Sequence, residues 1–137
     1  RGFGKNRWNG VGGKPNLNEK IEETAVRETQ EEIGVTPLNI EKHAVLNFYF
    51  PHNPDWNQQV IIYLAKNWVG KPKETEEMKP KWFDINNLPF KSMWPDDKYW
   101  LSKVLEGLTI NAEFLFEEND ILAEFKITEI ENVSPNT

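Results

Sequence analysis

The chain has 137 residues, a formal net charge of −6 and no cysteine. This length fits one domain, 1–137, that can bury a core without disulfides or thiolate metal sites. The negative charge argues against binding to a nucleic acid polymer, which needs a basic face. The longest apolar run, residues 60–65, is too short to span a membrane, and no secretion leader opens the chain. We expect a cytoplasmic monomer that binds neither a nucleic acid polymer nor a membrane.

The first predicted element is a glycine-rich loop followed by a helix. Residues 1–18 contain five of the eight glycines, and Asn18 is a suitable N-cap for a helix that stops at Gly34. The helical spacing is carried by four residues, which we expect on the buried side: Ile21, Ala25, Thr29 and Ile33.

Two strand-like runs follow, at residues 43–50 and 58–66, and the loop between them predicts a hairpin. Residues 81–85 are expected to form a short strand. Apolar spacing over residues 96–105 predicts a second helix. No regular strand–helix–strand rhythm is present, so we expect an α+β fold with a mixed sheet between helices.

The sequence "AEFLFEENDILAEFKI" contains two alternating runs around residues 118–120, which predict a second hairpin. Residues 128–137 are polar and are expected to form a flexible tail.

Three acids crowd the first helix within about one turn, namely Glu28, Glu31 and Glu32. Like charges at this spacing repel, and the simplest interpretation is a solvated acidic helix face. A divalent cation reverses this balance, because Mg²⁺ prefers oxygen ligands and binds a few carboxylates together with phosphates. The absence of nearby His or Cys favours such a hard ion over zinc.

The spacing of the loop and helix is more specific than the acids alone. Five residues separate Gly13 from Glu19, and seven residues separate Glu19 from the sequence "RETQEEIGV" at residues 27–35. This pattern resembles the motif of the Nudix hydrolase family. One position departs from it, because Thr29 stands where the family has a bulky aliphatic residue.

The resemblance implies a Nudix fold, in which a mixed sheet is sandwiched between helices and a loop–helix–loop holds Mg²⁺ or Mn²⁺. Residues 1–35 would form that loop and helix. The implied metal ligands are the three acids, the carbonyl of Gly12 and a further acid, Glu77, which could equally be solvated. The chemistry that the resemblance implies is the attack of water on a phosphorus of a nucleoside diphosphate derivative.

The resemblance also implies roles for residues beside the ligands. Arg27 would orient the glutamates, or it forms an ordinary surface salt bridge. Glu19 would brace the loop or reach the metal through water, or it simply complements the helix dipole. We prefer Glu32 as the general base.

Three other segments narrow the substrate. "RGFGKNRWNGVGGK", "KWFDINNLPFKSMWPDDKYW" and the C-terminal hairpin resemble the MutT-type oxidised purine nucleoside triphosphatases. This resemblance implies hydrolysis of 8-oxo-dGTP and similar damaged purine triphosphates to the monophosphate and pyrophosphate. Because that family has a strand before the glycine loop, we expect one sheet strand and one pocket wall to be missing from this chain.

Several residues suit a purine site. Trp94 offers a flat face for stacking, Phe3 and Phe48 an apolar slot, and Asn9 both a donor and an acceptor. The set of expected substrate-binding residues is Phe3, Asn9, Gly13, Phe48, Trp94, Asp96 and Asp97. If the two aspartates are buried together, one could keep a proton and present a donor beside an acceptor.

These residues also have plain structural interpretations. Asp96 suits the N-cap of the second helix, and Trp94 suits the core. Two functional alternatives remain open. One is a Nudix pyrophosphatase for ADP-ribose, a dinucleotide or an undamaged triphosphate, and the other is an inactive Nudix-fold binding module.

Overall fold

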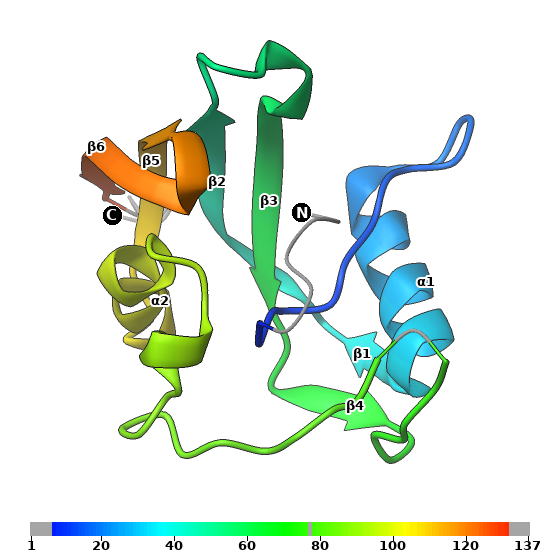
Figure 1. Ribbon diagram of the computed structural model, residues 1–137. Helices are drawn as coiled ribbons and strands as arrows, with labels where there is room; N and C mark the ends of the chain where they lie inside the picture. Colours follow the sequence, from blue (N-terminus) through cyan, green and yellow to red (C-terminus); the bar gives the residue numbers. More distant parts are fainter. Residues whose placement is uncertain (1–6, 77, 132–137) are drawn as a thin grey trace. The chain divides into compact units, whose positions relative to one another are not determined.

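The computed structural model describes residues 7–76 and 78–131 (Figure 1). These residues fall into two compact units, each held by its own contacts. The helix unit contains α1 (Ile21–Ile33), and the sheet unit contains most of the larger β-sheet. The helix unit comprises residues 9–41, 63–76 and 78–88, and the sheet unit comprises residues 7–8, 42–62 and 89–131.

Helix α1 confirms the predicted stop but not the predicted start. It ends at Gly34, whose φ of +74° is left-handed and whose N–H donates to the Gln30 carbonyl at 3.0 Å. The N-cap is Lys20 rather than Asn18. Asn18 has a φ of +65° and therefore belongs to the turn before the helix.

The buried side of α1 differs from the predicted stripe. Thr24 is the buried residue of the helix, whereas Ile21 is 47% exposed. Thr29, the departure from the family pattern, is half-buried and its hydroxyl donates to the Ala25 carbonyl at 2.7 Å. That hydrogen bond satisfies the hydroxyl within the helix, so threonine is accommodated in place of an aliphatic residue.

A small antiparallel sheet follows α1 in the helix unit. It pairs β1 (Thr36–Leu38) with β4 (Asn67–Val69), and neither strand was predicted. Each has only three residues, and β4 is exposed throughout. Strands this short carry no detectable alternation of apolar and polar residues.

The larger sheet has four strands in the order β3-β2-β5-β6 (Figure 1). Strand β2 is parallel to β5, and β5 is antiparallel to β6, so the sheet is mixed, as predicted. The strands of the first predicted hairpin, β2 and β3, are neighbours in it. The bounds are Glu41–Tyr49 for β2, Gln58–Leu64 for β3, Thr109–Glu117 for β5 and Ile121–Ile130 for β6.

The core of the sheet unit is a layer of phenylalanines. Phe48 pairs in register with Phe114, and the two rings stack with centroids 5.4 Å apart. Phe50 and Phe116 stack at the same spacing. All four are at most 1% exposed, and each such burial contributes about 1.5–3 kcal/mol. The predicted second helix is confirmed as α2 (Asp97–Leu105). It packs against β5.

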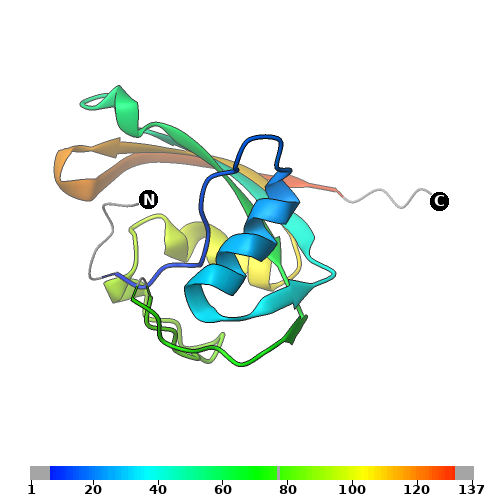
Figure 2. The ribbon, with the colours of Figure 1, turned by 90° about the vertical axis from the view of Figure 1, so that its right-hand side faces the viewer.

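The second predicted hairpin is confirmed by β5 and β6, which Figure 2 shows along their length. A short 3-10 turn (Glu118–Asp120) joins them, and the register shifts between Leu115 and Phe116. Strand β6 continues through Ile130, so the first three residues of the predicted tail are strand. Residues 132–137 lie outside the described part.

The predicted strand at residues 81–85 is wrong, because this segment has no regular structure. Trp82 and Ile85 are 68% and 62% exposed, and no neighbouring strand pairs with the segment in the described chain. Alternation alone did not make a strand here. No helix among the described residues is long and apolar enough to cross a membrane.

Candidate active site

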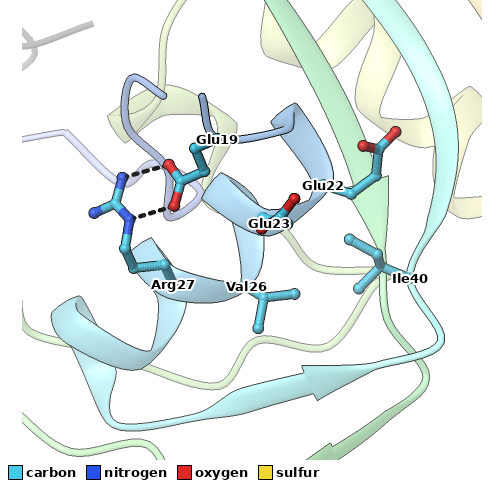
Figure 3. A pocket seen from close by; sticks show the side chains of 6 residues that line it. All are labelled: Glu19, Glu22, Glu23, Val26, Arg27 and Ile40. Carbon is cyan, nitrogen blue, oxygen red and sulfur yellow. Dashed lines mark hydrogen bonds and ion pairs between the residues drawn. The ribbon is translucent and has the colours of Figure 1, made fainter. Parts of the chain in front are cut away.

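Arg27 is the centre of the acid cluster in the helix unit. Its Nε and Nη2 donate to the two oxygens of Glu19, at 2.8 and 3.0 Å (Figure 3). Its Nη1 donates to Glu28 Oε1 at 2.7 Å and to Glu31 Oε2 at 3.1 Å. Arg27 therefore gathers three carboxylates, two from the helix and one from Glu19 in the segment before it, and offsets their mutual repulsion.

Glu19 joins the loop to the helix. One of its oxygens also accepts hydrogen bonds from the Asn16 N–H at 3.0 Å and the Thr24 hydroxyl at 2.7 Å. The Arg27 guanidinium, followed by these two donors, lowers the pKa of Glu19 to about 2. The same hydrogen bond to Glu19 raises the pKa of Arg27. These contacts fit the loop-bracing role expected of Glu19.

The glycine loop lies against the acids. The Gly12 N–H donates to Glu32 Oε2 at 3.2 Å, whereas the predicted contribution of Gly12 was its carbonyl. A Cβ on Gly13 would lie 2.4 Å from Glu28 Cδ, closer than real atoms approach. Glycine at position 13 therefore leaves the space that the Glu28 carboxylate fills.

The donor set suits a hard divalent cation, since it consists of carboxylate oxygens. Arg27 engages one oxygen of Glu28 and one of Glu31, and the other oxygen of each has no partner among the described residues. Nevertheless, no group of three acidic or histidine side chains in the described residues is placed to hold an ion together. Binding one would require the carboxylates to turn toward each other. Glu77, the remaining predicted ligand, lies outside the described residues.

A pocket of about 480 Å³ opens on another side of α1 (Figure 3). It is lined by Glu19, Glu22, Glu23, Val26, Arg27 and Ile40. None of the three predicted ligand acids lines it. The carboxylate of Glu22, one of the lining residues, accepts a hydrogen bond from the Tyr63 hydroxyl at 3.1 Å. Burial raises the pKa of Tyr63, and the contact with Glu22 raises it further.

The two predicted purine-binding aspartates are buried in the sheet unit. Asp96 is 0% and Asp97 is 3% exposed. Asp96 Oδ2 accepts from the Trp100 indole N–H at 2.8 Å, and Asp97 Oδ2 accepts from the Trp94 backbone N–H at 3.1 Å. Asp96 occupies the N-cap position of α2, but its side chain makes no capping hydrogen bond. The capping role predicted for this carboxylate is therefore wrong, because the indole takes it instead.

Trp94 is a core residue, 1% exposed, as its plain interpretation predicts. The Arg7 guanidinium lies 4.2 Å from its ring centroid, and the ring of Phe116 meets it edge-on at 6.0 Å. Arg7 also pairs with Asp120 at 3.3 Å. Neither contact was predicted from the sequence. The contact of Arg7 with Trp94 depends on tertiary structure, whereas Trp100 and Asp96 have the local i, i+4 spacing of a helix, which could have indicated their hydrogen bond.

The other predicted substrate residues are less informative. Phe48 lies in the core against Phe114, and Asn9 is exposed. Phe3 lies outside the described residues. The structure brings Gly12 and Gly13 to the glutamates of α1 within the helix unit, and it brings Trp94, Asp96 and Asp97 together within the sheet unit.

Comparison with known proteins shows the family of this chain. A family model for the NUDIX domain matches residues 1–104. An oxidized purine nucleoside triphosphate hydrolase from Danio rerio is 39% identical over 133 residues, covering 97% of this chain and 85% of the relative. The Mus musculus protein of the same name is 37% identical over 132 residues, covering 96% and 84%. An Escherichia coli (strain K12) 8-oxo-dGTP diphosphatase is 32% identical over 77 residues, covering 56% and 57%.

The fold agrees as well. The crystal structure of a MutT protein from Bacillus halodurans superposes with a TM-score of 0.78 at 23% identity. The match covers 85% of this chain and 79% of that one, which confirms the predicted α+β architecture. The family model matches most of the chain, and two relatives are more than 30% identical over nearly all of it. The chain therefore belongs to the Nudix hydrolase family.

Proposed function

We propose that this chain hydrolyses oxidised purine nucleoside triphosphates, such as 8-oxo-dGTP, to the monophosphate and pyrophosphate. Such an activity removes damaged nucleotides before they enter DNA. The observation that carries the proposal is the identity of 39% and 37% over nearly the whole chain to two oxidized purine nucleoside triphosphate hydrolases. The chain also keeps Glu28, Glu31 and Glu32, which an inactive binding module would not need.

The proposed cofactor is Mg²⁺, with Mn²⁺ as a substitute. Glu28, Glu31 and Glu32 would hold it, with Gly12 and Glu77 completing the set. When bound, such an ion neutralises phosphate charge and acidifies water. The all-oxygen donor set and the space that Gly13 leaves for Glu28 support this assignment.

The chain's own residues would prepare the site in three ways. Arg27 holds Glu28 and Glu31 beside each other, at 2.7 and 3.1 Å from its Nη1. Glu19 anchors Arg27 and the loop, and Arg27 in turn lowers the pKa of Glu19. Glu32 is the proposed general base, and the Gly12 N–H holds its carboxylate toward the loop. The backbone of the loop at Gly13 would lie along the phosphates.

The proposed base site uses the sheet unit. Asp96 and Asp97 are adjacent and buried, which supports their pairing with the polar edge of a purine. Trp94 would supply a stacking face and Phe48 an apolar contact. The Arg7 guanidinium already covers one face of Trp94, so a purine would use the opposite face or displace Arg7.

The test is a substrate comparison on the purified chain with Mg²⁺. We expect 8-oxo-dGTP to be cleaved to monophosphate and pyrophosphate with a higher kcat/KM than dGTP, and ADP-ribose to be cleaved least. Preferential cleavage of ADP-ribose would overturn the proposal in favour of another Nudix pyrophosphatase. Chromatography of the products identifies which bond is broken.

A matched pair of variants tests the acid cluster. Glu32→Gln should lower kcat by roughly 10²–10⁴-fold, the usual contribution of a general base. Glu23→Gln makes the same change at an exposed position on the same helix and should retain activity. Equal activities for the two variants would mean that Glu32 is not the base.

A further inference from the structure

The last turn of α1 is held by a segment that lies 43 positions further along the chain. The Thr75 hydroxyl donates to the backbone carbonyl of Glu32 at 2.7 Å. The Lys73 N–H donates to the carbonyl of Ile33 at 3.0 Å. The last carbonyls of a helix have no partner within it, so residues 73–75 act as an external C-cap for α1.

Side-chain packing closes the same contact. A Cβ on Gly34 would lie 2.6 Å from Lys73 Cε and 3.2 Å from its Cγ, so the lysine stem lies directly over the glycine that ends the helix. The last turn of α1 contains no basic residue of its own. A lysine stem over this end brings a cation toward the negative end of the helix dipole.

A backbone hydrogen bond holds Thr75 in place. Its N–H donates to the Met78 carbonyl at 2.9 Å. Between these two residues in the sequence stand Glu76 and Glu77, the second being the metal ligand expected from outside the helix. The Thr75 side chain thus holds the backbone of Glu32, the proposed base, from a position 43 residues further along the chain.

We propose that Thr75 is a positioning residue for the hydrolysis: its hydroxyl fixes the backbone at Glu32 and thereby the place of the carboxylates in the last turn of α1. This inference rests on the proposed function for its kinetic consequence, but its effect on ion binding stands without it. Loss of the hydroxyl would leave the fold intact and allow the last helical turn to fray.

The experiment compares three variants of the full chain. Thr75→Val keeps the shape and loses the donor, and Thr75→Ser keeps the donor. Thr36→Val is the matched control, because the Thr36 hydroxyl donates at the same 2.7 Å to a residue of the same helix, but to the exposed side chain of Gln30. Each variant is measured for kcat and KM with 8-oxo-dGTP, for Mn²⁺ affinity by electron paramagnetic resonance without nucleotide, and for amide hydrogen exchange in residues 30–34.

The expected result is specific to Thr75→Val. Its kcat and Mn²⁺ affinity should each fall by about 3- to 10-fold, the effect of one hydrogen bond, while KM stays within about twofold. Exchange at residues 30–34 should be faster in this variant only. Thr75→Ser should restore all three readouts, and Thr36→Val should resemble the original chain.

Two results would overturn the inference. One is Thr75→Val with unchanged kcat and Mn²⁺ affinity. The other is an equal loss in Thr75→Val and Thr75→Ser, which would mean that packing rather than the donor matters. If the original chain does not cleave 8-oxo-dGTP, the proposed function fails, and Mn²⁺ affinity still decides the role of Thr75.

Discussion

Arg7 lies over Trp94, with its guanidinium carbon 4.2 Å from the centroid of the indole ring. The same guanidinium pairs with Asp120 at 3.3 Å, in the turn that joins β5 to β6. A cation over an indole face is favoured by the negative charge of the ring surface. Arg7 therefore connects the start of the described chain to the C-terminal hairpin. It also covers the ring that we propose stacks on the substrate.

The first prediction concerns the energy of this contact. Arg7→Ala should lower the free energy of unfolding by about 0.5–2 kcal/mol, since Trp94 is buried and the cation partly desolvated. Urea denaturation measures the loss. Lys98→Ala, which removes a cation 5.1 Å from the exposed ring of Tyr99, should cost less. Equal costs would indicate that the Arg7 contact contributes no more than a surface one.

The second prediction separates folding from activity at the glycine loop. Gly13→Ala places a methyl group against the carboxyl end of Glu28, a flexible side chain that can move. The variant should therefore fold with a nearly unchanged melting temperature but bind Mn²⁺ more weakly. Gly10→Ala is its control, because a Cβ at Gly10 meets nothing within 4 Å. If both variants bind Mn²⁺ equally, the space at Gly13 does not serve Glu28.

The third prediction is a pH dependence of stability. Glu19 has its pKa lowered from 4.5 to about 2 in the folded chain, chiefly by Arg27. A lowered carboxyl pKa contributes stability that is complete above about 4.5 and is lost as the pH falls toward 2. The difference in unfolding free energy between the original chain and Glu19→Gln should shrink over that range. It is measured by urea unfolding at several pH values.

Arg27→Gln provides the second arm of this test. Because Arg27 is the largest cause of the lowered pKa, its removal should abolish most of the same pH dependence. A dependence that persists in Arg27→Gln would assign the effect to the Asn16 N–H and the Thr24 hydroxyl instead.

The fourth prediction concerns the buried Asp96. Trp100→Phe removes the indole N–H that donates to Asp96 Oδ2 at 2.8 Å, while it keeps an aromatic ring in the core. Loss of a donor to a buried carboxylate should cost about 1–3 kcal/mol of stability, in addition to the lost ring volume. Thermal unfolding measures it. Trp82→Phe, at a position 68% exposed, should leave the melting temperature nearly unchanged.

The features predicted correctly from the sequence are those with a local signal. Helix α1 follows from periodicity and ends where Gly34 permits a left-handed residue. The β5–β6 hairpin follows from two alternating runs around a polar turn. The three acids of α1 were singled out by their crowding on the helix and by their spacing from Gly13, and their role as metal ligands stays a prediction.

The misses have physical reasons. Residues 81–85 alternate like a strand but have no neighbour to pair with in the described chain, and a strand is stabilised by its partner. Contacts such as Thr75 with Glu32 or Arg7 with Trp94 join residues far apart in the chain, and nothing near either residue specifies the other. The exact partners of Arg27 likewise depended on side-chain geometry.

The parallel pairing of β2 with β5 has a consequence for the order in which the chain folds. Phe48 and Phe114 meet in register only after the intervening loops and α2 have been bridged. Closing so large a loop is entropically costly and slows folding. The phenylalanine layer thus cannot form on a nascent polypeptide until β5 has left the ribosome, and until then the phenylalanines of β2 lack their partners in the sheet.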